Sequence, residues 1–138
     1  MNARPKWLRP VAIVAVLWNV LGCLAFAADA RISASDIARM PIEQQHLYAA
    51  RPGWSVVGTA VAVIAGVLGS VALTQPHRIA WPLLLASLIG VLVQDAGLVI
   101  ASGGMPATPA LAMQGLVLVI AIVLALLAHR YARGLPKA

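Results

Sequence analysis

The chain has 138 residues, of which 62% are hydrophobic and 10% are charged, and its formal net charge is +6. Soluble domains carry about 25% charged residues, so this composition excludes a water-soluble globular domain. The basic residues lie beside apolar runs, where they act as membrane-topology signals, and we expect no nucleic-acid partner. A single cysteine, Cys23, excludes an intrachain disulfide and a cysteine-based metal cluster.

Four segments are long and apolar enough to cross a bilayer, which takes roughly 20 residues of helix. They are apolar nearly all round, as helices in lipid are, and lack the alternation of a membrane β-barrel. The sequence therefore predicts an all-α membrane protein, with four transmembrane helices in one antiparallel bundle. This single domain covers residues 1–138, with spans at about 8–28, 54–74, 79–101 and 109–128.

The first span allows a second interpretation. Its charged N-terminal flank and the "AFA" at 25–27 resemble a cleavable signal peptide. The long apolar stretch, with Trp18 and Asn19 inside it, favours a retained helix. Cleavage of residues 1–27 stays open, and it would leave the orientation of the other three spans unchanged.

Residues 29–53 form the longest connection and predict one or two short helices that cap the bundle or lie on the membrane surface. Ser35 is the expected N-cap of a turn that starts at Asp36, and Pro41 is expected to open a second helix. In the same way, Thr108 is the expected N-cap of the fourth span, with Pro109 as its first residue.

The basic residues predict the orientation in the membrane, because cytoplasmic loops carry an excess of Lys and Arg. Seven of them fall on one side and three on the other, which places both termini in the cytoplasm and the 29–53 loop outside. The seven are Arg4, Lys6, Arg9, Arg78, Arg130, Arg133 and Lys137, and the three are Arg31, Arg39 and Arg51.

Polar side chains inside the spans are the candidate functional residues. Asn19, Thr59, Gln94, Asp95 and Gln114 all fall in the outer half of the membrane, so we expect one hydrogen-bonded cluster around Asp95. This cluster holds the helices together in one interpretation and forms a transport site in the other.

A stripe of small residues marks the second span. Gly58, Ala62, Gly66 and Ser70 repeat every four residues, which places them on one helix face and lets a neighbouring backbone approach closely. We expect this span to be the most buried helix or the seam of a dimer.

Signs of catalysis are few. The sequence has no glycine-rich phosphate loop, no metal-ligand spacing, and no nucleophile with an obvious base, so we expect no enzymatic activity, no cofactor and no metal. Approach of His77 and His129 to form a haem or metal site is the alternative, and polar helix ends are the simpler interpretation of both.

Several segments recur together in one family: "LWNVLG", "MPIEQQHLYAARPGW", "VIAGVLGS" and "AWPLLLASLIGVLVQ". Over about residues 7–100 the chain resembles the small four-helix bacterial inner-membrane proteins commonly labelled "sugar transporter". The resemblance implies the same fold and assigns no mechanism. Asp95 departs from it, because an uncharged residue usually follows "VQ" there.

Two functions follow from these features. We expect a non-enzymatic accessory or structural component of the bacterial inner membrane, either as a homo-oligomer or within a larger membrane complex. The alternative is a small homo-oligomeric transporter of a sugar-like solute that uses the cluster around Asp95. Four helices alone can hardly enclose an aqueous path.

Overall fold

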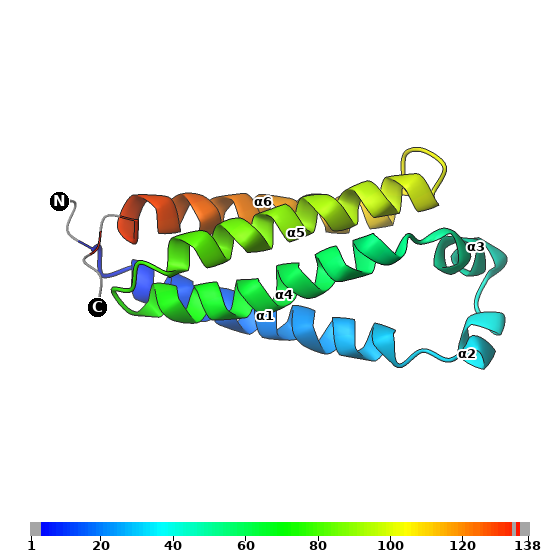
Figure 1. The fold of residues 1–138 in the computed structure, drawn as a ribbon, viewed down its shortest axis with the longest axis horizontal. Helices are drawn as coiled ribbons and strands as arrows, with labels where there is room; N and C mark the ends of the chain where they lie inside the picture. The colour runs from blue at the N-terminus through cyan, green and yellow to red at the C-terminus, as the bar shows by residue number, and fades with distance from the viewer. Residues whose placement is uncertain (1–3, 134, 136–138) are drawn as a thin grey trace.

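The computed structural model describes residues 4–133 and 135, and four long helices dominate it (Figure 1). Each is long and apolar enough to cross a membrane. The prediction of an all-α membrane protein with four packed spans, and short helices between the first two, is confirmed. The spans are α1 (Leu8–Ala30), α4 (Gly53–Thr74), α5 (Ala80–Ala101) and α6 (Thr108–Tyr131).

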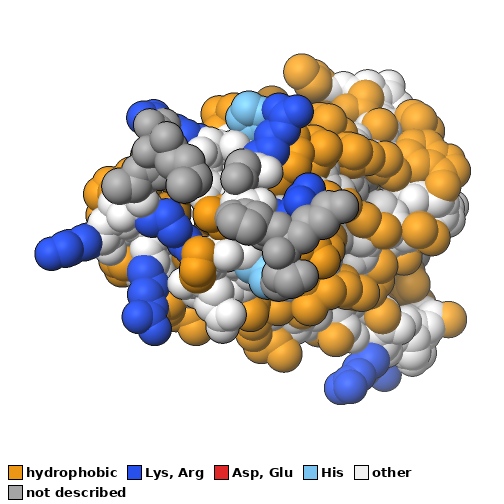
Figure 2. Space-filling model, turned by 60° about the vertical axis from the view of Figure 1, so that its left-hand side comes forward, with side chains coloured by type: hydrophobic (Ala, Val, Ile, Leu, Met, Phe, Trp, Pro, Cys, Tyr) orange, Lys and Arg blue, Asp and Glu red, His pale blue; other side chains and the backbone are white. Residues whose placement is uncertain are grey.

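The bundle has two different ends. Helix α1 begins and α6 ends at one end, here called the terminal end, while α2 and α3 lie at the opposite, loop end (Figure 1). Figure 2 looks towards the terminal end and shows Lys and Arg side chains gathered around it. Most of the seven basic residues predicted to share one side of the membrane lie at this end. Lys137 lies outside the described residues.

Helix α4 is the centre of the bundle. It packs along α1 on one side and along α5 on the other, while α6 packs mainly on α5. Among the four spans α4 has the largest buried share, 39% of its apolar window, as expected for the helix that carries the small-residue stripe.

All four spans meet at the terminal end. Their apolar side chains form one core there, which Trp7 and Tyr131 border with rings packed edge to face at 6.1 Å. This core closes the terminal end of the bundle. Its buried members are Leu8, Ala12, Ala15, Leu73, Ala80, Leu84, Leu124, Ala128 and Ala132.

The 29–53 loop contains both of the short helices that the sequence suggested, α2 (Ala34–Ala38) and α3 (Ile42–Ala50). Pro41 precedes α3 as expected, but the N-cap of α2 is Ser33, not Ser35. Ser33 is the N-cap because it lies three residues before Asp36. The Ser33 hydroxyl accepts from the Asp36 backbone N–H, and the Asp36 carboxylate accepts from the Ser33 backbone N–H.

The start of α6 also differs from the prediction by one residue. Ala107 occupies the N-cap position, and Thr108 is already helical. Pro109 still lies in the first turn, where its missing N–H and fixed φ suit a helix start.

Candidate functional site

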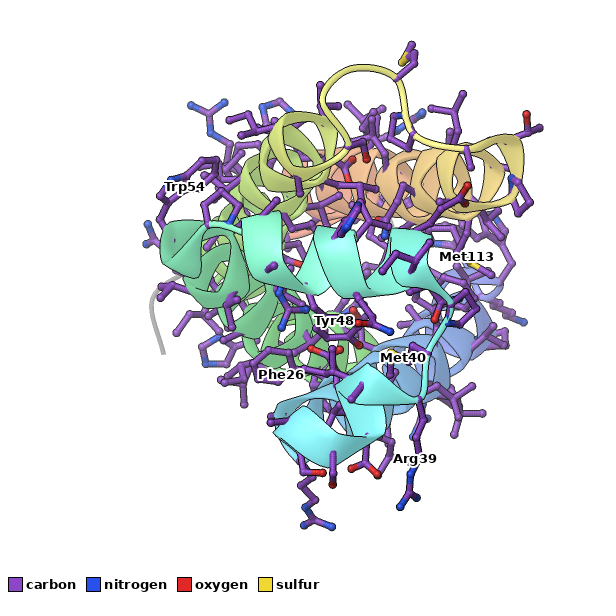
Figure 3. All side chains as sticks on the ribbon, turned by 90° about the vertical axis from the view of Figure 1, so that its right-hand side faces the viewer. Phe26, Arg39, Met40, Tyr48, Trp54 and Met113 are labelled. Atoms are coloured by element: carbon purple, nitrogen blue, oxygen red, sulfur yellow. The ribbon has the colours of Figure 1, made fainter. Side chains whose placement is uncertain are left out.

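A cavity of about 420 Å³ lies near the loop end of the bundle. All four spans contribute to it, and α3 lies across the end of the bundle beside it, so segments from the whole chain line this partly open cavity (Figure 3). Most of its surface is apolar, and its polar groups gather at the rim and in the depth. The lining residues are Gly22, Ala25, Phe26, Asp29, Leu47, Tyr48, Arg51, Ser55, Val56, Thr59, Val63, Gln94, Leu98, Ala101 and Gln114.

Three side chains at the rim, Asp29, Tyr48 and Arg51, form what we call the rim triad. The Tyr48 hydroxyl donates to Asp29 Oδ1 at 2.6 Å, and Arg51 Nη1 donates to Asp29 Oδ2 at 2.8 Å. Asp29 lies in the last turn of α1, where a negative charge opposes the helix dipole, so both partners offset an unfavourable position. The rim triad thereby ties α3 to the end of α1.

Water reaches the rim triad, because 37% of the Arg51 side chain and 28% of the Asp29 side chain are exposed. The hydrogen bond to Asp29, helped by partial burial, raises the pKa of Tyr48 above its usual value. A raised pKa favours the neutral phenol. This bond therefore stabilises the packing of α3 on α1 fully at neutral pH. The stabilisation is lost as the pH rises through the Tyr48 pKa, above about pH 10.

We expect Asp29→Asn to loosen α3 without unfolding the bundle. The change removes the ion pair and weakens the bond from Tyr48, and an exposed ion pair contributes only about 0–1 kcal/mol. Hydrogen exchange should therefore speed up several-fold in α3 and stay unchanged in α4 and α5. Glu43→Gln, on the exposed side of α3, is the matched control. If hydrogen exchange in α3 is equally slow in Asp29→Asn and in the unchanged chain, the rim triad does not hold α3 in place.

The five polar residues expected to form one cluster lie in separate contacts. Only Gln94 and Gln114 meet: Gln94 Nε2 donates to Gln114 Oε1 at 2.9 Å, deep in the cavity. Asn19 donates to Ser70 Oγ at 3.2 Å, and Thr59 donates to the Ser55 carbonyl of its own helix at 3.1 Å.

Among the other four, Asp95 interacts only with its neighbour Gln94. It has no hydrogen bond to Asn19, Thr59 or Gln114 among the described residues, and its buried Oδ1 has no partner there. It is also absent from the lining of the cavity, which its neighbour Gln94 joins. The structure therefore places the polar centre of the cavity at Gln94 and Gln114.

Among the described residues, one side-chain hydrogen bond instead crosses each of the three main interfaces between spans. Asn19 with Ser70 joins α1 to α4, and Gln94 with Gln114 joins α5 to α6. Between α4 and α5, the buried Ser87 hydroxyl donates to the Ala62 carbonyl at 2.6 Å. Such bonds between transmembrane helices contribute about 0.6 kcal/mol each on average, and they fix the register of each pair.

The small-residue stripe of α4 is buried throughout, at Gly58, Ala62, Gly66 and Ser70. Its counterpart on α5 was missed in the sequence: a Cβ on Gly90 would lie 2.6 Å from the Ala62 backbone nitrogen and from the Gly58 carbonyl oxygen. Ser87, Gly90 and Gly97 are all buried on α5. Their spacing of three and seven residues was the signal that could have found this face.

Within the described residues, no group of three or more His, Cys, Asp or Glu could hold a metal ion. His129 packs against Trp81 at 4.7 Å and bonds to Arg133 at 2.7 Å. His77 Nδ1 accepts from the Ile79 backbone N–H. His77 and His129 thus each have local partners at the terminal end of the bundle.

Comparisons with protein-family models, with curated proteins and with solved structures found no match. The four long apolar helices make this a small multi-pass membrane protein in contact with a lipid bilayer. No family is identified, so the cavity and its residues are the basis for any functional assignment.

Proposed function

We propose that this chain is a non-enzymatic accessory component of the bacterial inner membrane that binds a small molecule in its loop-end cavity. The cavity carries this proposal: at about 420 Å³ it has the size of a small-molecule site, with apolar walls and few polar groups. The polar groups at its rim bond to one another, which suits holding a ligand better than attacking one.

Binding can be tested on molecules that co-purify with the chain in mild detergent, measured by native mass spectrometry. Val56→Trp fills the cavity from α4, and Val57→Trp is the matched control because Val57 is 64% exposed on the lipid-facing side. We expect Val56→Trp to lose a bound species that the unchanged chain and Val57→Trp retain. A bound species that survives in Val56→Trp would contradict the site.

Transport by a homo-oligomer is the second candidate. One observation favours it: the cavity lies near the loop end, while a packed core closes the terminal end. A space closed at one end is what one state of an alternating-access carrier requires. Ligand uptake into proteoliposomes, abolished by Val56→Trp, would move this candidate ahead of the accessory role.

The proposal includes an orientation with both termini in the cytoplasm, so that the cavity opens towards the outside. The basic side chains gathered at the terminal end support it (Figure 2). We expect a C-terminal alkaline phosphatase fusion to be inactive and a fusion within 29–53 to be active. The reverse pattern would place the cavity on the cytoplasmic side.

A further inference from the structure

A second, smaller hollow of about 70 Å³ adjoins the cavity on the side towards the terminal end. Gly22, Val63 and Gln94 line both spaces, so the two follow one another along the bundle. Trp18 of α1 and Val117 of α6 both line the smaller hollow, together with residues of α4 and α5. It therefore lies in the seam between α1 and α6, two helices that pack on α4 and α5 and not extensively on each other within the described chain.

The charges of the cavity do not call for a charged ligand. Asp29 and Arg51 already neutralise each other at the rim. In the depth, the polar groups are the two carboxamides of Gln94 and Gln114, which carry no charge. An ionic group placed beside them would lose its hydration without a counter-charge, which is costly in an apolar site.

The carboxamide pair has a specific hydrogen-bonding capacity to spare. Its single bond, from Gln94 Nε2 to Gln114 Oε1, leaves the Gln94 oxygen as an acceptor and the Gln114 NH₂ group as a donor. One hydroxyl group can satisfy both, because it donates one hydrogen bond and accepts another. The walls around the pair are mostly apolar, and the hydroxyls of Ser55 and Thr59, which also line the cavity, already donate to backbone carbonyls.

We propose that the ligand is a neutral, mostly apolar alcohol, with its hydroxyl on the Gln94–Gln114 pair and its hydrocarbon part against the cavity walls and the α1–α6 seam. This inference rests on the proposed binding function and narrows its ligand class. A sugar is disfavoured, because it carries more hydroxyls than the carboxamide pair can satisfy, and each hydroxyl buried against the apolar walls would lack a partner at a cost. An apolar alcohol partitions into the bilayer and reaches the seam from there.

The test measures binding of tritiated 1-dodecanol to the full chain in dodecyl maltoside micelles by scintillation proximity. We expect saturable binding that unlabelled dodecanol displaces and that dodecyl sulfate and glucose do not. Gln94→Leu keeps the volume but removes the acceptor, so it should weaken dodecanol binding by about 3- to 10-fold, the equivalent of one hydrogen bond. Gln44→Leu, at an exposed position of α3 outside the lining, is the control and should change nothing.

The outcomes separate the ligand class from the binding function. If Val56→Trp blocks binding of glucose or dodecyl sulfate, and dodecanol does not bind, the cavity is a site but the alcohol assignment is wrong. If dodecanol binds Gln94→Leu as tightly as the unchanged chain, the alcohol assignment is also wrong. If neither Val56→Trp nor Thr59→Phe changes the binding of any of the three probes, the cavity is not a site and the proposed function fails with it. Two variants are used so that one folding failure does not decide the result.

Discussion

Gly90→Ala is expected to destabilise the bundle strongly, although it adds one methyl group. The new Cβ would lie 2.6 Å from both the Ala62 backbone nitrogen and the Gly58 carbonyl oxygen. These are backbone atoms of a helix, which cannot move aside as a flexible side chain can. The two helices would have to separate along their most extensive interface.

The free energy of unfolding should fall by about 1–3 kcal/mol, the usual range for adding a group to a tightly packed core. Separation would also lengthen the bond from Ser87 to the Ala62 carbonyl, one turn away on the same interface. In lipid, close packing of small residues replaces the hydrophobic effect as the main attraction between helices, so the loss has no easy compensation.

Gly115→Ala is the control, since a Cβ on Gly115 meets nothing within 4 Å. It removes a glycine from a helix interior, which favours the helix by about 0.5–1 kcal/mol. Thermal unfolding in detergent should therefore show a clear loss for Gly90→Ala and no loss for Gly115→Ala. Equal unfolding temperatures in the two variants would contradict the close α4–α5 packing.

Composition and length were enough to predict the four spans, because a helix in lipid must satisfy its own backbone and present apolar side chains outward. The stripe on α4 was also visible, since four small residues at a spacing of four share one face. Its partner face on α5 gives a weaker signal, because Ser87, Gly90 and Gly97 follow one another at unequal spacings of three and seven residues.

The expected polar cluster shows where sequence reasoning stops. Depth in the membrane follows from residue number, and four of the five residues do fall in the loop-end half of their spans, whereas Asn19 lies at the midpoint of α1. The rotation of each helix about its own axis, relative to its neighbours, does not follow from residue number. Gln94 and Asp95 are neighbours in sequence but point about 100° apart, so one lines the cavity and the other does not. Only the packing of α5 on its neighbours decides which of them joins the site.

The cavity itself could not be predicted, because it combines α1 and α6 with α3 through contacts far apart in the sequence. The rim triad joins Asp29 to Tyr48 and Arg51 across the α2 segment. Each of these residues reads as an ordinary polar loop residue in isolation. Their meeting depends on where α3 comes to rest across the end of the bundle (Figure 3).

Asp95→Leu is expected to stabilise the chain, in contrast to most substitutions of a buried polar residue. Asp95 Oδ1 is buried and has no hydrogen-bond partner among the described residues. A buried polar atom without a partner costs about 1–3 kcal/mol. A carboxylate in a transmembrane helix adds an insertion cost of about 2.5–3.5 kcal/mol at the centre, falling towards the interface. Leucine branches at the same carbon, is larger than aspartate, and carries neither cost.

The gain in unfolding free energy should be about 1–2 kcal/mol, since part of the relief is offset by imperfect packing of the new side chain. Asp95→Asn keeps a polar oxygen in the same place and should change stability less than Asp95→Leu. This order distinguishes an orphaned polar group from a carboxyl that is held by partners, for which both variants would destabilise.

Gln94→Leu, one residue away, is a control for which we expect the opposite change in stability. It removes the bond to Gln114 and leaves that carboxamide without its partner, so it should destabilise where Asp95→Leu stabilises. Unfolding of all three variants can be followed by circular dichroism in the same detergent. A loss of stability in Asp95→Leu as large as that in Gln94→Leu would show that the Asp95 carboxyl is bonded in the folded chain.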